Sequence, residues 1–197
     1  MARMWKTRTL DCSRDFAWNA RETLAVRVAE VYAHVPVLDD PANGRGHHDL
    51  RISLKRLRYS LEFFAVCYDP AEISWLIESF STIQDLLGDL HDAEVLVPEL
   101  QRTLGQLVEQ RARAVHTIRA RRVRRADPMH FDTFAAEVGR ASEQKAQPGI
   151  VSVINRLRRQ RQVAYRAAVE LWQRLEAEGL RGRLDRLSRA PEPGALP

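Results

Sequence analysis

The sequence has few cysteines, no long hydrophobic run and no leader-like N-terminus. Its 197 residues contain two cysteines, Cys12 and Cys67, neither in a CxxC pair, which excludes a disulfide scaffold. Reduced thiols in a cytoplasmic protein are therefore expected. The longest apolar run spans only residues 63–68, so no transmembrane helix is predicted. No apolar segment follows the basic residues 1–8, which argues against a signal peptide.

The sequence also lacks the motifs of common enzyme classes. It contains no P-loop, no HExxH motif and no nucleophile elbow. Adjacent histidines on a helix point about 100° apart, so His47, His48 and His91 do not predict a metal site. We therefore expect a binding protein and not an enzyme, with no catalytic residue, metal or cofactor.

Helical periodicity accounts for most of the chain, and no strand pattern is present. Low glycine and proline content and 45% apolar residues exclude collagen-like and low-complexity chains. The prediction is an all-α antiparallel bundle of long helices in one domain, residues 1–189. Ser13 is the expected N-cap of the first helix, and Pro98 is expected to begin a helix. Helices are expected at 14–35, 48–68, 71–90, 98–125, 150–178 and about 180–187, a loop or short helix at 127–149, and a disordered tail at 190–197.

Lysine is scarce and charge is segregated. Arginine supplies 28 of the 31 basic residues, and the net charge is +5. A GC-rich coding sequence would favour arginine everywhere, but it would not decide where the arginines fall. Residues 69–99 hold eight acids and no Lys or Arg, whereas 111–125 and 154–166 hold seven and five arginines and no acid. Arginine makes forked contacts to phosphate, so the basic segments favour a polyanionic partner.

One stripe of the second predicted helix carries four cationic or titratable groups on adjacent turns: His48, Arg51, Lys55 and Arg58. They fall within about 80° of one another and flank the apolar stripe. Like charges on adjacent turns repel, so this ladder makes sense where an anion neutralises it. Glu62 lies on the same stripe and is expected to hold one arginine in place.

Other helices send arginines toward sides that should meet neighbouring helices. Because a buried unpaired guanidinium is costly, two explanations stay open. Either acids of the 69–99 segment pair with the basic groups, or the bundle contains a wet, positive channel. The arginines concerned are Arg14, Arg21, Arg111, Arg158 and Arg161, and the candidate acids are Glu78, Asp85, Asp89 and Asp92.

Two motifs resemble those of CHAD domains, the conserved-histidine α-helical domains. In the first, His48 is followed by Arg51, by Lys55 with Arg56, and by Arg58. In the second, residues 83–95 contain a Leu-Gly step followed by a His-Asp step. The resemblance covers roughly residues 9–100. It implies a helical bundle that binds inorganic polyphosphate in a basic channel, with ligands His48, Arg51, Lys55, Arg58 and, less clearly placed, Arg56.

Only one copy of the first motif is present, although the family usually has two related halves. The chain is then either a half-length version that works alone or one half of a two-fold symmetric homodimer. The resemblance also implies a cytoplasmic location, with polyphosphate granules as one destination. The alternatives to polyphosphate binding are a nucleic-acid-binding helical protein that uses residues 111–125, and a granule-associated adaptor.

Overall fold

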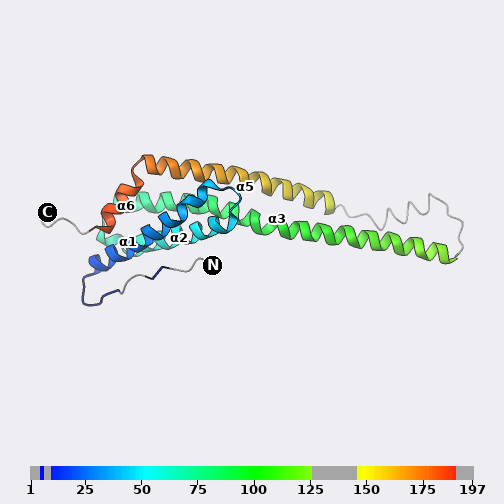
Figure 1. The fold of residues 1–197 in the computed structure, drawn as a ribbon, viewed down its shortest axis with the longest axis horizontal. Helices are drawn as coiled ribbons and strands as arrows, with labels where there is room; N and C mark the ends of the chain where they lie inside the picture. Colours follow the sequence, from blue (N-terminus) through cyan, green and yellow to red (C-terminus); the bar gives the residue numbers. More distant parts are fainter. Residues whose placement is uncertain (1–4, 7–9, 126–145, 190–197) are drawn as a thin grey trace. The chain divides into compact units, whose positions relative to one another are not determined.

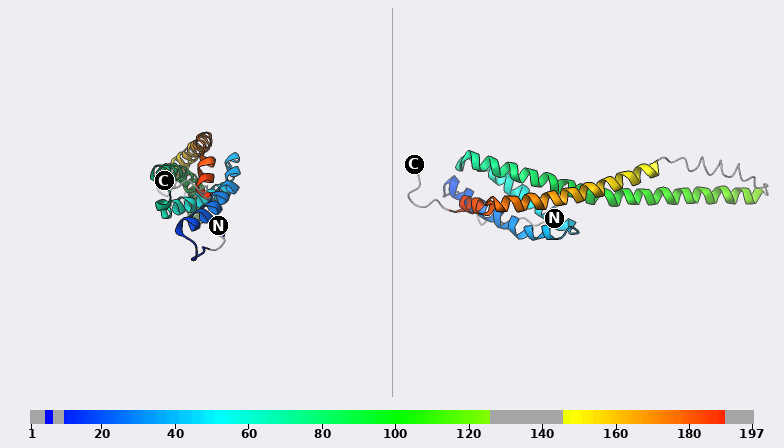
Figure 2. Two further views of the ribbon diagram at one scale, coloured as in Figure 1. Left: turned by 90° about the vertical axis from the view of Figure 1, so that its left-hand side faces the viewer. Right: turned by 90° about the horizontal axis from the view of Figure 1, so that it is seen from above.

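The computed structural model describes residues 5–6, 10–125 and 146–189. All regular elements in these ranges are helical, which confirms the all-α prediction (Figure 1). The chain divides into two compact units, Met1–Asp92 with Arg161–Pro197, and Ala93–Gln160. The first unit is called the bundle here, and Figure 2 shows its helices from two further directions. The predicted tail at 190–197 and most of the predicted loop at 127–149 lie outside the described residues.

Within the described residues, one long helix spans the two helices predicted at 71–90 and 98–125, whereas the first two helices are slightly shorter than predicted. The order along the chain is α1 (Phe16–His34), the 3-10 helix η1 (Val35–Asp39), α2 (Gly44–Phe63), the 3-10 helix η2 (Ala65–Cys67), α3 (Pro70–Arg125), α5 (Ala146–Ala177) and α6 (Leu180–Ser188).

The start of α1 differs from the prediction by two residues, because Asp15 and not Ser13 is the N-cap. The Asp15 carboxylate accepts a hydrogen bond from the Trp18 amide at 2.5 Å. Ser13 is engaged elsewhere, since its amide and hydroxyl both donate to the Asp11 carboxylate. Arg14 therefore precedes the helix and is not part of its face.

Helix α2 starts four residues earlier than expected, at two glycines that the sequence pattern assigns to a loop. Asn43 caps the helix by accepting a hydrogen bond from the Gly46 amide at 2.9 Å. A Cβ atom on Gly46 would lie 2.1 Å from Cγ2 of Val37. Gly46 is thus required by the close approach of η1 and does not mark a loop.

Helix α3 passes through Pro98, so the prediction that Pro98 begins a new helix is wrong. A proline inside a helix removes one backbone hydrogen bond and disfavours continuation. The apolar positions nevertheless keep one register on both sides, at 90, 93, 97, 100, 104 and 107. One continuous apolar stripe thus favours one continuous helix.

Helix α5 begins at Ala146, four residues before the predicted start, and includes Pro148 and Gly149. Proline is tolerated in a first helical turn because amides there have no intrahelical partner. The helix ends at Ala177, one residue before the predicted end, and Gly179 beyond it has φ 84°, the left-handed conformation that glycine adopts without strain. Helix α6 then covers the segment for which a short helix was expected.

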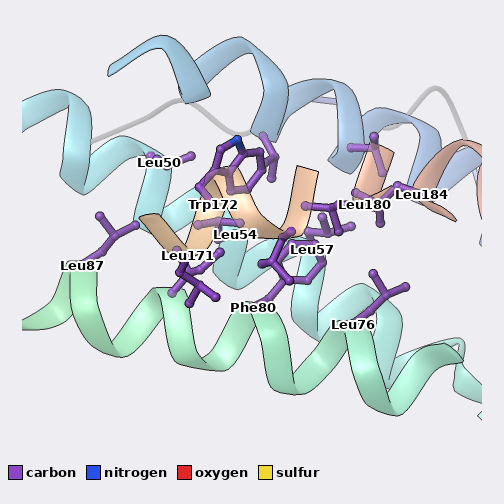
Figure 3. Close-up of a cluster of buried hydrophobic side chains, with 14 of the residues drawn as sticks. Leu50, Leu54, Leu57, Leu76, Phe80, Leu87, Leu171, Trp172, Leu180 and Leu184 are labelled. Atoms are coloured by element: carbon purple, nitrogen blue, oxygen red, sulfur yellow. The ribbon is translucent and has the colours of Figure 1, made fainter. Parts of the chain in front are cut away.

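The bundle has one hydrophobic core, built by α1, α2, the first part of α3, the second part of α5, and α6. Leu54, Leu57 and Phe80 are fully buried at its centre, and Trp172 of α5 packs against α1 (Figure 3). Tyr32 of α1 meets the Trp172 ring edge-on and donates a hydrogen bond to Glu176 at 2.7 Å. Burial and this hydrogen bond raise the pKa of Tyr32. Among the described residues, no helix has the length and apolar character needed to span a membrane.

A buried ion network ties α1 to α2. The Glu30 carboxylate is fully buried and accepts from the guanidinium groups of Arg27 and Arg56, both at 2.5 Å. Arg27 also donates to the Trp5 carbonyl at 3.1 Å, and the Trp5 amide donates to Glu30 at 3.4 Å. Two arginines thus share one carboxylate. A buried carboxylate needs such partners, because taking a charge out of water is costly.

Candidate phosphate-binding seam

The ladder of basic groups lies on α2 as predicted, along the flank of its buried leucine stripe. His48, Arg51 and Arg58 are half-buried and Lys55 is exposed. The half-buried state matters because it keeps the charged heads near water while their positions are fixed by packing.

A stripe of α3 faces the ladder. Gln84, Gly88 and His91 recur at spacings of four and three residues, which puts them on one side of that helix. Three pairs of neighbours join the two helices in antiparallel order. Arg58 Nε donates to Gln84 Oε1 at 3.4 Å, a Cβ on Gly88 would lie 3.8 Å from Arg51 Nε, and the His48 and His91 ring centroids are 4.6 Å apart. We call this arrangement the α2–α3 seam.

The seam contains buried polar atoms that have no hydrogen-bond partner. Arg51 Nε, Gln84 Nε2 and His48 Nδ1 are all in this state. Buried polar atoms are almost always paired, and each one left unpaired costs about 1–3 kcal/mol. Arg51 Nε and Gln84 Nε2 are donors only, so what they lack is an acceptor. An oxyanion supplies several acceptors at once.

The seam holds more positively charged side chains than carboxylates. Glu62 forms an ion pair with Arg58, one turn away, which confirms the expectation that it holds one arginine in place. Among the described residues, no carboxylate lies within ion-pair distance of Arg51, Lys55 or His48. The ladder is further ordered by Tyr59, whose ring lies 5.6 Å from Lys55 Nζ and 4.6 Å from Arg58 Cζ.

The acids of α3 do not neutralise the ladder. Asp85, Asp89 and Asp92 are exposed and lie on the flank of α3 beyond the Gln84–His91 stripe. Of the two explanations that the sequence leaves open, pairing with these acids is therefore wrong for the ladder. The structure presents a seam between two helices, and a closed central channel stays a prediction.

Arg56 belongs to a different face of α2. It projects toward α1, where it pairs with buried Glu30, so its charge is already balanced. It therefore serves the fold and is not part of the seam, although its place in the family motif predicted a ligand. Its position on the helix, about 100° from Lys55, is the physical reason.

Arg14 and Arg21 lie at the opposite end of α2 from His48. Phe16 of α1 packs against Phe64 with ring centroids 5.0 Å apart, so the start of α1 meets the end of α2. Arg14 is largely exposed, with its guanidinium 5.6 Å from the centre of the Trp18 ring. Arg21 lies near Cys67: burial raises the pKa of that thiol and the charge of Arg21 opposes the rise. A helix rises about 1.5 Å per residue, so these groups are some 20 Å from His48 along α2.

The three arginines predicted on the later helices do not all belong to the bundle. Arg161 reaches the loop before α2, where it donates to the Pro41 carbonyl at 2.6 Å. Arg111 and Arg158 belong to the Ala93–Gln160 unit and are exposed. The prediction that these two face a core is wrong, because helical periodicity identifies a side of a helix but not whether anything packs there.

The sequence patterns did not single out Gln84. Gly88 and His91 entered only through the second family motif and, for His91, through a metal site that the sequence does not predict. The signal was present in the 84–88–91 spacing beside an apolar stripe, but this stripe contains no Lys or Arg to mark it as a phosphate site. In the described ranges, no group of three or more His, Cys, Asp or Glu side chains has a metal-binding arrangement.

A comparison with protein families finds a match that includes the seam. Residues 13–101 match the family model of the CHAD domain. The chain carries one CHAD domain. The matched CHAD segment includes α1, α2 and the part of α3 that forms the seam, and CHAD domains in general are known for polyphosphate binding. No curated protein and no solved structure matches the chain.

Proposed function

We propose that the α2–α3 seam binds inorganic polyphosphate without catalysing a reaction on it. One observation carries the proposal: Arg51 is a half-buried cation with a buried donor atom and no acceptor among the described residues. His48, Lys55 and Arg58 extend the positive charge along the same flank of α2. The general property of CHAD domains supports phosphate polymers as the ligand class.

The geometry suits a linear polyanion that lies along α2. From His48 to Arg58 the helix rises by about 15 Å, so successive phosphate groups of one chain can meet successive side chains. Arginine forks bind non-bridging oxygens in pairs, lysine contributes a mobile point charge, and histidine donates from a ring nitrogen. We propose that the polyanion is the partner of the CHAD domain in the cytoplasm and at polyphosphate granules. Assembly into a homodimer stays a prediction.

A titration with polyphosphate of defined length at two salt concentrations tests the proposal. Binding to a phosphate polymer releases counterions, so affinity should fall steeply with salt. For three or four cationic contacts and the single-strand slope, the Kd should rise roughly 20- to 50-fold between 50 and 200 mM salt. Absence of saturable binding at the lower salt concentration contradicts the proposed function.

A further inference from the structure

We propose that Gln84 and His91 of α3 bind the polyphosphate directly, so that phosphate groups enter the seam and do not lie on the outer face of α2 alone. This inference rests on the proposed function and assigns a second wall, which contains no Lys or Arg, to the same site. Its basis is that two of the three unpaired buried atoms at the seam, Gln84 Nε2 and Arg51 Nε, are donors on opposite walls.

The orientation of Gln84 follows from its neighbour. Arg58 Nε donates to the Gln84 carbonyl oxygen at 3.4 Å, which fixes the amide so that its NH2 group points away from Arg58. That NH2 group is the buried atom without a partner. One phosphate oxygen accepting from Gln84 would satisfy it.

His91 occupies the matching place at the other end of the seam. Its ring lies against His48, with centroids 4.6 Å apart and the ring planes at 38°. Two imidazoles in contact can both donate to one anion, whereas they repel each other when both are protonated and no anion is present. A phosphate group bound here therefore contacts both helices.

Gly88 lies between these two positions and faces Arg51. A methyl group there would be in ordinary contact with Arg51 Nε, at 3.8 Å, and a longer side chain would fill the space in front of it. The α3 wall thus contains no carboxylate along the seam, and the acids of α3 lie on the next flank. This pattern admits an anion to Arg51 from the α3 side.

The first test removes donors and keeps shape. Gln84→Met and His91→Phe retain side-chain volume, and phenylalanine retains the ring contact with His48. Each substitution should weaken polyphosphate binding about 10-fold, the loss expected for one hydrogen bond to a charged group. The thermal midpoint of Gln84→Met without ligand should stay the same or rise, since an unpaired buried donor is removed. Unchanged affinity in both variants overturns the inference.

The second test fills the seam from Gly88. Gly88→Ala should fold and bind within about threefold of the parent, whereas Gly88→Glu should bind at least about 10-fold more weakly because its carboxylate occupies Arg51. Thr82→Glu is the charge-matched control, as Thr82 is exposed on α3 away from the seam. Equal losses in Gly88→Glu and Thr82→Glu would mean that only net charge matters, which overturns the inference.

The two proposals fail in different ways. If the parent chain does not bind polyphosphate, the proposed function is wrong. If the parent binds and Arg51→Ala weakens binding, but the Gln84, His91 and Gly88 variants bind like the parent, the function stands and the second wall is wrong.

Discussion

Replacing Arg51 and Arg58 together by alanine is expected to remove most polyphosphate binding and to leave the helical content unchanged. Hydrogen bonds to charged groups contribute about 1.5–3 kcal/mol each, so losing both should weaken binding roughly 100-fold or more. Neither arginine holds the fold: Arg51 has no hydrogen bond within the described residues, and Arg58 contacts only half-buried or exposed groups, those of Gln84, Tyr59 and Glu62. Fluorescence titration at moderate salt measures the affinity, and far-UV circular dichroism measures the helicity.

The matched control is Arg14→Ala with Arg166→Ala, which removes the same charge from two exposed positions. This control should lower affinity by no more than about threefold, the general effect of net charge on a polyanion. If the seam variant binds like this control, the assignment of the seam is wrong, whatever the absolute affinity.

The second large effect is expected on stability. Glu30→Ala should lower the free energy of unfolding by about 3–5 kcal/mol, because it leaves Arg27 and Arg56 without the buried carboxylate they share. Urea denaturation followed by circular dichroism measures this change. The reason is desolvation: a guanidinium as buried as Arg27, which is 5% exposed, has little access to water that could replace the carboxylate.

A triple variant separates this network from simple loss of packing. Arg27→Met, Glu30→Leu and Arg56→Met together replace all three charged groups with apolar groups of similar volume, a change that is often neutral or stabilising for buried ion networks. The triple variant should thus be more stable than Glu30→Ala alone. A Glu30→Ala loss below about 1 kcal/mol contradicts the buried network.

The sequence predicted most of the fold and half of the seam, for identifiable physical reasons. Apolar spacing located α1, α2, α3 and α5, because burial of one helix face imposes that spacing. It misplaced boundaries where local chemistry decides, as at Asp15, which competes with Ser13 for the cap, and at Pro98, where a continuous apolar stripe outweighs a lost hydrogen bond.

Only the α2 side of the seam could be predicted from the sequence, for a similar reason. His48, Arg51, Lys55 and Arg58 carry charge, so their spacing was informative without any partner. The opposite wall, Gln84 and His91, acquires meaning only from the antiparallel packing that sets it against the ladder. Arg111 and Arg158 show the converse, since their spacing suggested a core-facing side and the structure exposes them.

Competition between polyphosphate and double-stranded DNA tests the central claim most directly, because both ligands would exploit the same positive charge. Labelled DNA is first bound to the full chain at low salt, and either unlabelled ligand is then added at equal phosphate equivalents. The seam account predicts that polyphosphate displaces the DNA at phosphate concentrations at least roughly 10-fold lower than unlabelled DNA requires. Displacement at equal phosphate equivalents, or more effective displacement by DNA, would contradict a seam built for a single phosphate chain and favour nucleic-acid binding by the arginines of residues 111–125.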